Sequence, residues 1–136
     1  MAAFFPEAAY AQVKAIADPN GDWTSRLVSE YRLDLEAAHA LVGGGARLVT
    51  VEVPSDYAHW VDPGACDNRV GYYEAPNSRV VYTSGGQLRS LGIASMISWR
   101  GVWYVVHLGA VVRSVDAGVV DDPSIGAGVA APSSTC

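Results

Sequence analysis

The histidine at position 107 is the first residue to consider for chemistry, because it lies in the aromatic stretch SWRGVWYVVHLGA at residues 98–110. A histidine that acts as a base needs an acidic partner to hold its tautomer and a cavity that admits a substrate. No acidic residue lies within two positions of His107 in the sequence. We therefore interpret His107 as a packing or surface residue of a strand rather than as a catalytic base.

A second group of ionisable side chains lies between residues 55 and 68. It comprises Asp56, Tyr57, His59, Asp62 and Asp67. A metal site needs ligands that converge at defined spacing, such as two histidines one helical turn apart, whereas this segment has one histidine among scattered acids. Its Asp, Pro, Gly and Asn residues are typical of turns. We read the segment as a solvated loop and expect no metal and no cofactor.

The two cysteines are Cys66, in the turn-rich stretch WVDPGACDN, and Cys136, the last residue of a Gly/Ala/Pro/Ser-rich tail. A nucleophilic Cys66 would have to be a thiolate, which the neighbouring Asp67 disfavours. A Cys66–Cys136 disulfide would anchor the tail and contribute on the order of 4 kcal/mol in the chain-entropy model. We predict this bridge, which would place the protein outside a reducing cytosol. The alternative is two unrelated thiols.

The glycine-rich stretch GGGAR at residues 43–47 is the remaining motif of interest. It follows an expected helix and precedes an expected strand, the reverse of the order in a phosphate-binding loop, and it lacks the Lys-Ser/Thr of such loops. We interpret it as a helix stop.

The composition of the chain restricts the classes of binding partner that can be expected. The chain has 136 residues, with nine Lys and Arg against fourteen Asp and Glu, and a net charge of -5 without a basic cluster. These features disfavour a nucleic acid or an anionic membrane surface as partner. No apolar run approaches the roughly 20 residues of a membrane span. The N-terminal MAAFFPEAAY lacks the features of a signal peptide, so the protein is either cytoplasmic or carries an export signal upstream of Met1.

The elements follow from turn residues and hydrophobic spacing. We expect a helix over residues 5–17, a break at 18–22, and an amphipathic helix from Thr24 that ends at Gly43. A strand over residues 46–54 stops at Pro54, and residues 55–68 form a loop with at most one helical turn. We assign residues 1–110 to a single domain and residues 111–136 to a C-terminal tail tethered back to it.

Three two-residue turns, at 76–77, 85–86 and 100–101, predict a four-stranded antiparallel meander up to Ala110. The predicted facing pairs are Glu74–Arg79, Tyr82–Arg89, Val80–Leu91, Trp99–Val102, Ile97–Tyr104 and Ala94–His107. Side-chain alternation then gives the meander one apolar face, which the helices should cover, and one mixed face. We name Tyr72, Met96, Trp103 and His107 on the mixed face as the candidate contact or ligand surface.

The fold class expected from this order is α+β, with two N-terminal helices on a curved, mainly antiparallel sheet. The arrangement resembles the cone-shaped fold of nuclear transport factor two and ketosteroid isomerase, and cystatin-like folds are the near alternative. An enzyme of the isomerase type would need a carboxylate and a Tyr or Asp donor inside the cone. Tyr31, Asp34 and Tyr104 are the available side chains, and no specific pattern marks them.

The stretch from Val70 to Ala110, with PGACDN before it and the ending VDDPSIGAGVAAPSSTC, resembles a family of small exported or lipoprotein-type actinobacterial proteins of unassigned function. The resemblance extends from Val51 to Cys136 and is strongest from Pro63 to Ala110. It implies an export signal upstream of Met1 and supports the Cys66–Cys136 pairing. It carries over no catalytic residue.

Together these observations lead us to expect a non-catalytic, exported accessory or binding domain at the actinobacterial cell envelope. Its partner would be a second copy of the chain or another envelope protein. The alternative is a small cone-fold enzyme or ligand binder that handles protons in an internal pocket. A deep cavity lined by a strongly shifted carboxylate or histidine would favour the alternative, whereas a filled core would favour the interaction domain.

Overall fold

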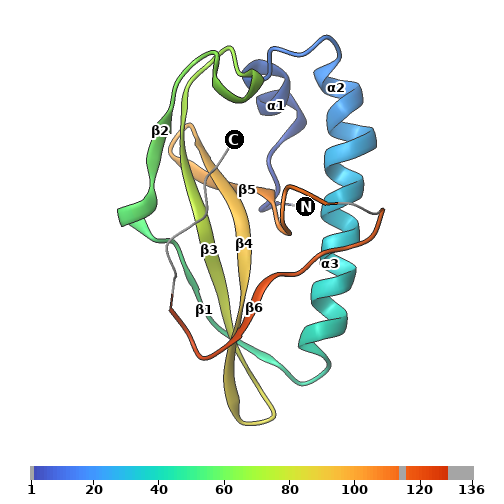
Figure 1. Cartoon of the computed structure of the whole chain (residues 1–136), viewed down its shortest axis with the longest axis vertical. Helices are drawn as coiled ribbons and strands as arrows, with labels where there is room; N and C mark the ends of the chain where they lie inside the picture. Colours follow the sequence, from blue (N-terminus) through green and yellow to red (C-terminus); the bar gives the residue numbers. More distant parts are fainter. Residues whose placement is uncertain (1, 114–115, 129–136) are drawn as a thin grey trace.

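Helices from the N-terminal third of the chain lie against one antiparallel sheet (Figure 1). The structure, a computed structural model, describes residues 2–113 and 116–128. The helical elements are α1 (Glu7–Val13), α2 (Pro19–Asp22), a π-helical turn (Trp23–Leu27) and α3 (Val28–Val42). The last three follow one another without a break and form one long helical stretch. The predicted α+β class is confirmed.

The start of the long helical stretch differs from the prediction. Residues 18–22, predicted to be a break between two helices, instead form the start of the second one. The Asp18 side chain caps it by accepting a hydrogen bond from the Gly21 amide at 2.9 Å. Pro19 occupies the first helical position, where its missing N–H is not needed. At the other end Gly43, with a φ of 72°, terminates α3 as predicted.

The first helix is shorter than residues 5–17. It ends at Val13, and Lys14 is already extended and forms an isolated antiparallel bridge with Asn68. The next amide, that of Ala15, donates to the Asp67 carbonyl at 2.7 Å. The chain therefore leaves the helix in order to pair with the turn that follows β2.

The sheet contains six strands in the described part of the chain. They are β1 (Arg47–Glu52), β2 (His59–Val61), β3 (Tyr72–Ser84), β4 (Gln87–Trp99), β5 (Val102–His107) and β6 (Asp121–Ile125). The order is β1-β3-β4-β5, while β2 also pairs with β3 and β6 also pairs with β4. The sheet is antiparallel, as predicted, and it is not strongly curled (Figure 1).

The predicted turn at residues 76–77 is also wrong. Strand β3 continues through these residues, with Pro76 opposite Ser95 and Ser78 opposite Ile93. Asn77 has a φ of 58°, yet the register of β3 with β4 is the same before and after it, so it lies within a continuous strand rather than in a turn. As a result Glu74 lies opposite Ile97 instead of Arg79, and two predicted strands become one.

The other two turns are confirmed. Both residues of each turn have positive φ, as a two-residue hairpin of this kind requires. The observed pairs include Tyr82–Arg89, Val80–Leu91, Ile97–Tyr104 and Trp99–Val102, all as predicted. The pair Ala94–His107 is wrong, because a register shift between Ser95 and Met96 places Ser95 opposite His107.

The segment at 55–68 is more ordered than a loop. It holds two short 3₁₀ turns, Ser55–Tyr57 and Ala65–Asp67, on either side of β2. Strand β2 has only three residues, too few for alternation to reveal it, and it pairs with the start of β3.

Aromatic side chains join the N-terminal segment to the sheet and the helices. Phe4 stacks on Tyr31 with ring centroids 4.2 Å apart, while Phe5 packs edge-on against Trp99 and Tyr104. The core also takes in Tyr72 and Met96, which are both buried. These contacts fix residues 4 and 5 between α1, α3 and the sheet.

Residues 111–128, expected to belong to the tail, contribute β6 to the sheet. Asp34 on α3 accepts hydrogen bonds from the Gly109 and Val119 amides and from Arg113, which fixes the chain on either side of the undescribed residues 114–115. The predicted Cys66–Cys136 bridge lies outside the described residues, because Cys136 does.

Candidate functional site

A cavity of about 930 Å³ lies between α1, the turn at 65–68, strands β3 to β5 and the segment that precedes β6. Its wall is partly aromatic and aliphatic and partly polar. The lining residues include Phe5, Tyr10, Lys14, Arg26, Asn68, Tyr72, Glu74, Ala94, Ser95 and His107. Cavities of this volume accommodate drug-sized molecules.

His107 belongs to the cavity wall. The register shift pairs His107 with Ser95 and takes it out of the mixed face that the sequence predicted. His107 instead shares the cavity wall with Phe5 and with residues of α1. Burial is the main reason that the pKa of His107 falls to about 4, and the positive charges of Arg26 and Lys14 lower it further. The imidazole is therefore neutral at physiological pH, able to donate one hydrogen bond and to accept another.

A buried carboxylate lies on the same wall. Glu74 on β3 accepts a hydrogen bond of 2.5 Å from the Ser95 hydroxyl, and both residues are buried. Its second oxygen lies 3.7 Å from Nε2 of His59 on β2. Nδ1 of the same ring lies 3.1 Å from the Tyr57 carbonyl oxygen.

Asn68 and Tyr72 form a further polar pair at the cavity. The Asn68 amide nitrogen donates to the Tyr72 hydroxyl at 3.0 Å, and burial raises the pKa of that phenol. The amide oxygen of Asn68 is buried without a partner among the described residues. A buried acceptor left in this state costs about 1–3 kcal/mol, which is tolerated most often at functional positions.

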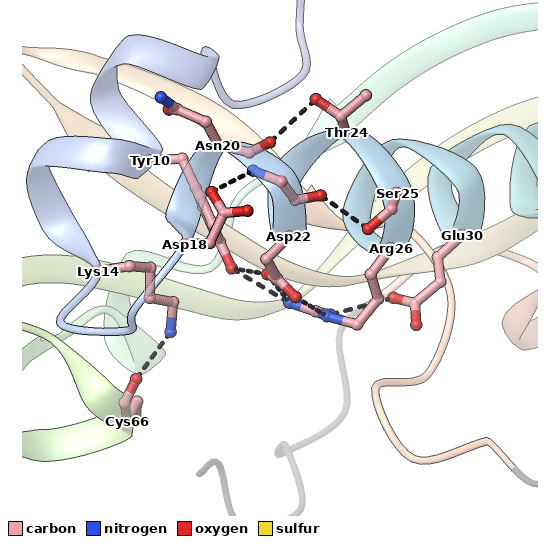
Figure 2. A network of polar contacts seen from close by, with 11 residues as sticks. Tyr10, Lys14, Asp18, Asn20, Asp22, Thr24, Ser25, Arg26, Glu30 and Cys66 are labelled. Atoms are coloured by element: carbon pink, nitrogen blue, oxygen red, sulfur yellow. Dashed lines mark hydrogen bonds and ion pairs between the residues drawn. The ribbon is translucent and has the colours of Figure 1, made fainter.

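The helical side of the cavity is held by a network of charged side chains, which Figure 2 shows. The Tyr10 hydroxyl donates to Asp22 at 2.5 Å, and Arg26 contacts the same carboxylate at 2.6 Å. Burial raises the pKa of Tyr10, while hydrogen bonding from Arg26 lowers the pKa of Asp22. Lys14 donates to the Cys66 carbonyl at 2.7 Å, and burial lowers the pKa of its amine (Figure 2).

The four residues named from the sequence as a contact or ligand surface separate in the structure. Tyr72 and His107 line the cavity, whereas Met96 and Trp103 do not. Met96 is buried in the core and Trp103 packs partly buried against it. Met96 is therefore covered by the protein's own residues, while Tyr72 belongs to the cavity wall rather than to an outer sheet face.

The other residues considered for chemistry are spread across the molecule. Tyr31 lies in the core, Tyr104 packs against Phe5, and Asp34 is bound by amides and Arg113. Of the ionisable side chains named between residues 55 and 68, only that of Asp67 lines the cavity. No group of three or more His, Cys, Asp or Glu side chains in the described part of the chain is arranged to hold a metal ion.

Sequence reasoning missed Glu74, Ser95 and Asn68 as residues of the site. Glu74 was assigned to a cross-strand pair with Arg79 by the wrong turn at 76–77. The sequence did contain a signal for Glu74. It lies two positions after Tyr72, which was named as a site residue, and residues two apart in a strand share one face of the sheet. Ser95 and Asn68 had no signal, because their role depends on partners 21 and 4 residues away.

Fold and site together define a small α+β domain with a ligand-sized cavity between its helices and its sheet. Comparison of the chain with protein-family models, with characterised proteins and with solved structures finds no match. None of the helices in the described part of the chain combines the length and the apolar character needed to cross a bilayer.

Proposed function

We propose that this protein is a non-catalytic binding domain that holds a small, neutral, partly aromatic molecule in the cavity. The observation that carries the proposal is the cavity of about 930 Å³ with the neutral His107 in its wall. A cavity with such a histidine supports the alternative expected from the sequence, a small enzyme or ligand binder with an internal pocket, so the proposed binding site lies in this cavity and not on an outer sheet face.

The chemistry of the wall selects the ligand class. Phe5, Tyr10 and Tyr72 offer aromatic surface, while His107 and Ser95 offer hydrogen-bonding groups without net charge. Several charged groups of the wall are already engaged by the protein: Arg26 by Asp22, Lys14 by the Cys66 carbonyl, Glu74 by Ser95 and Asp122 by Arg79. A strongly charged ligand would therefore have to displace existing contacts, and a neutral one would not.

The cellular location and the family remain part of the proposal. An exported protein at an actinobacterial envelope is consistent with the predicted Cys66–Cys136 bridge. A likeness to the nuclear transport factor two or ketosteroid isomerase cone is retained only as a proposal for the topology. Proton-transfer catalysis in the cavity is the competing function, and the buried pair Glu74 and Ser95 is the observation in its favour.

A fluorescent probe tests the binding proposal. We expect the neutral aromatic dye 1-N-phenylnaphthylamine to bind the full chain with saturable, one-to-one stoichiometry. Ala94→Trp, which places an indole in the cavity wall, should weaken binding at least about tenfold by filling the space. Ala8→Trp is the matched control, because Ala8 is exposed on α1, and it should bind as the wild type does.

Two outcomes would contradict the proposal. One is the absence of saturable binding by the folded wild-type chain. The other is equal binding by Ala94→Trp and Ala8→Trp, which would place the dye outside the cavity. Turnover of a bound compound that depends on Glu74 would instead favour the competing catalytic function.

A further inference from the structure

Strand β1 is the exposed edge of the sheet, and its side chains are unusually apolar for such a position. Leu48 is 68% exposed, Val49 is 55% exposed and Val51 is 45% exposed. One edge of β1 pairs with β3, and its other edge pairs with no strand in residues 2–113 and 116–128. Soluble proteins usually protect a free edge, since its unpaired amides and carbonyls can add another strand.

The opposite edge of the same sheet shows such protection. There, residues 3–5 cover β5: the Phe5 amide donates to the Val105 carbonyl at 2.9 Å, and the Val105 amide donates to the Ala3 carbonyl at 2.8 Å. Among residues 2–113 and 116–128, no segment hydrogen-bonds to the backbone of the free edge of β1, and the strand has no interior Lys or Pro. The chain after β6 reaches only the end of β1, where the Gly128 amide donates to the Glu52 side chain at 3.2 Å. The single irregularity of β1 is the bulge at Val49, which takes that residue out of the ladder with β3.

We propose that two copies of this chain associate through their β1 strands, paired antiparallel around a two-fold axis between Val49 and Thr50. The sequence Arg47-Leu48-Val49-Thr50-Val51-Glu52 is complementary to itself in this register. Arg47 of each copy lies opposite Glu52 of the other, and Leu48 lies opposite Val51. Opposite charges and apolar pairs across strands are both favourable.

A second copy fits this edge better than an unrelated strand, because the charge pattern repeats itself under two-fold rotation. The two Arg47–Glu52 contacts form at the two ends of the paired strands. Between them lie the exposed side chains of residues 48–51 of each copy. The contact extends over roughly 20 Å, the length of a six-residue strand. A contact of this size is smaller than a standard stable interface, so the dimer should be weak and concentration-dependent.

Charge exchange tests the register. In sedimentation experiments on the full chain, we expect the wild type to dimerise reversibly as its concentration rises. Arg47→Glu alone and Glu52→Arg alone each place like charges opposite one another and should raise the dimer dissociation constant about tenfold. The double variant Arg47→Glu/Glu52→Arg restores opposite charges and should return the constant to within about threefold of the wild type.

The matched control lies on α3, where Arg32 and Glu36 are exposed and spaced by one helical turn. Arg32→Glu and Glu36→Arg change the net charge by the same amounts and should leave dimerisation unchanged. A wild type that stays monomeric at all concentrations overturns the proposal. A double variant that dimerises no better than the single ones overturns it as well. This result does not depend on a ligand, so it is independent of the cavity proposal.

Discussion

Ser95 on β4 lies opposite His107 on β5, and this pair sets both residues in the wall of the cavity. A one-residue bulge at Val106 produces the pairing, because Met96 lies opposite Val105 while the next pair along β4 skips Val106. Ser95 in turn donates to Glu74 on β3. Three neighbouring strands therefore each contribute one polar residue to the same wall.

The first prediction concerns the pH dependence of stability. Because burial lowers the pKa of His107 from 6.5 to about 4, the unfolded chain binds this proton more readily than the folded protein does. The resulting stability is present above the unfolded value and is lost as the pH falls through 6.5 toward 4. The loss attributable to His107 at the lower end is about 3 kcal/mol.

The variant His107→Gln removes this titration. Its free energy of unfolding, measured by urea denaturation at several pH values, should fall by about 3 kcal/mol less than that of the wild type over the same range. His39→Gln is the control, because His39 is exposed on α3. Parallel pH profiles for the wild type and His107→Gln would show that the imidazole is not buried as described.

The second prediction concerns Asp34, whose carboxylate is 1% exposed. It accepts from the amides of Gly109 and Val119 and forms an ion pair of 2.8 Å with Arg113. Asp34→Ala leaves two amides without their acceptor and removes the ion pair with Arg113, so the free energy of unfolding should fall by about 3 kcal/mol or more. The exposed Glu36→Ala on the same helix should change it by less than about 0.5 kcal/mol.

The third prediction concerns Arg79, a guanidinium that is almost fully buried between β4 and β6. It donates twice to Ser90 and also contacts Asp122 through the side chain at 2.8 Å and the carbonyl at 2.6 Å. A lysine cannot reproduce this fork of donors, so Arg79→Lys should cost about 3 kcal/mol. Arg100→Lys, in an exposed turn, is the matched control.

Hydrogen exchange adds a local measurement to the Arg79 variant. If the guanidinium holds β6 against the sheet, the amides of Asp121–Ile125 should exchange faster in Arg79→Lys while those of β3 keep their relative protection. Uniform acceleration throughout the chain would instead mean that Arg79 stabilises the fold only as a whole.

The fourth prediction concerns the cysteines. If Cys66 and Cys136 are bridged, the unreduced protein has a mass two hydrogens below that of the reduced chain, and it offers no thiol to an alkylating reagent. Reduction should lower the free energy of unfolding by on the order of 4 kcal/mol in the chain-entropy model. Two alkylated cysteines in freshly purified native protein would rule out the bridge.

The parts of the fold that depend on local chemistry could be predicted from the sequence. Gly85-Gly86 and Arg100-Gly101 adopt the positive φ values that two-residue turns require, and Gly43 ends α3. The errors arose where one local signal serves two structures. Asn77 has the positive φ of a turn residue, but it lies inside β3, whose register with β4 is unchanged across it.

The site was less predictable, because contacts between distant residues create it. The position of His107 depends on a bulge that shifts the register by one residue, and alternation counted from the turn cannot reveal such a shift. The segment from Gly109 to Ile125 has no hydrophobic periodicity of its own. Within it, Gly109 and Val119 are held by Asp34, which lies 75 residues before Gly109, and Asp122 is held by Arg79.

The most direct test of the account is a crystal structure of the full chain soaked with a mixed library of neutral aromatic small molecules. The account predicts density for a bound molecule in the cavity, in contact with Phe5, Tyr72 and His107. A cavity that proves to be filled by the chain itself, or molecules found only on the outer surface, would contradict it.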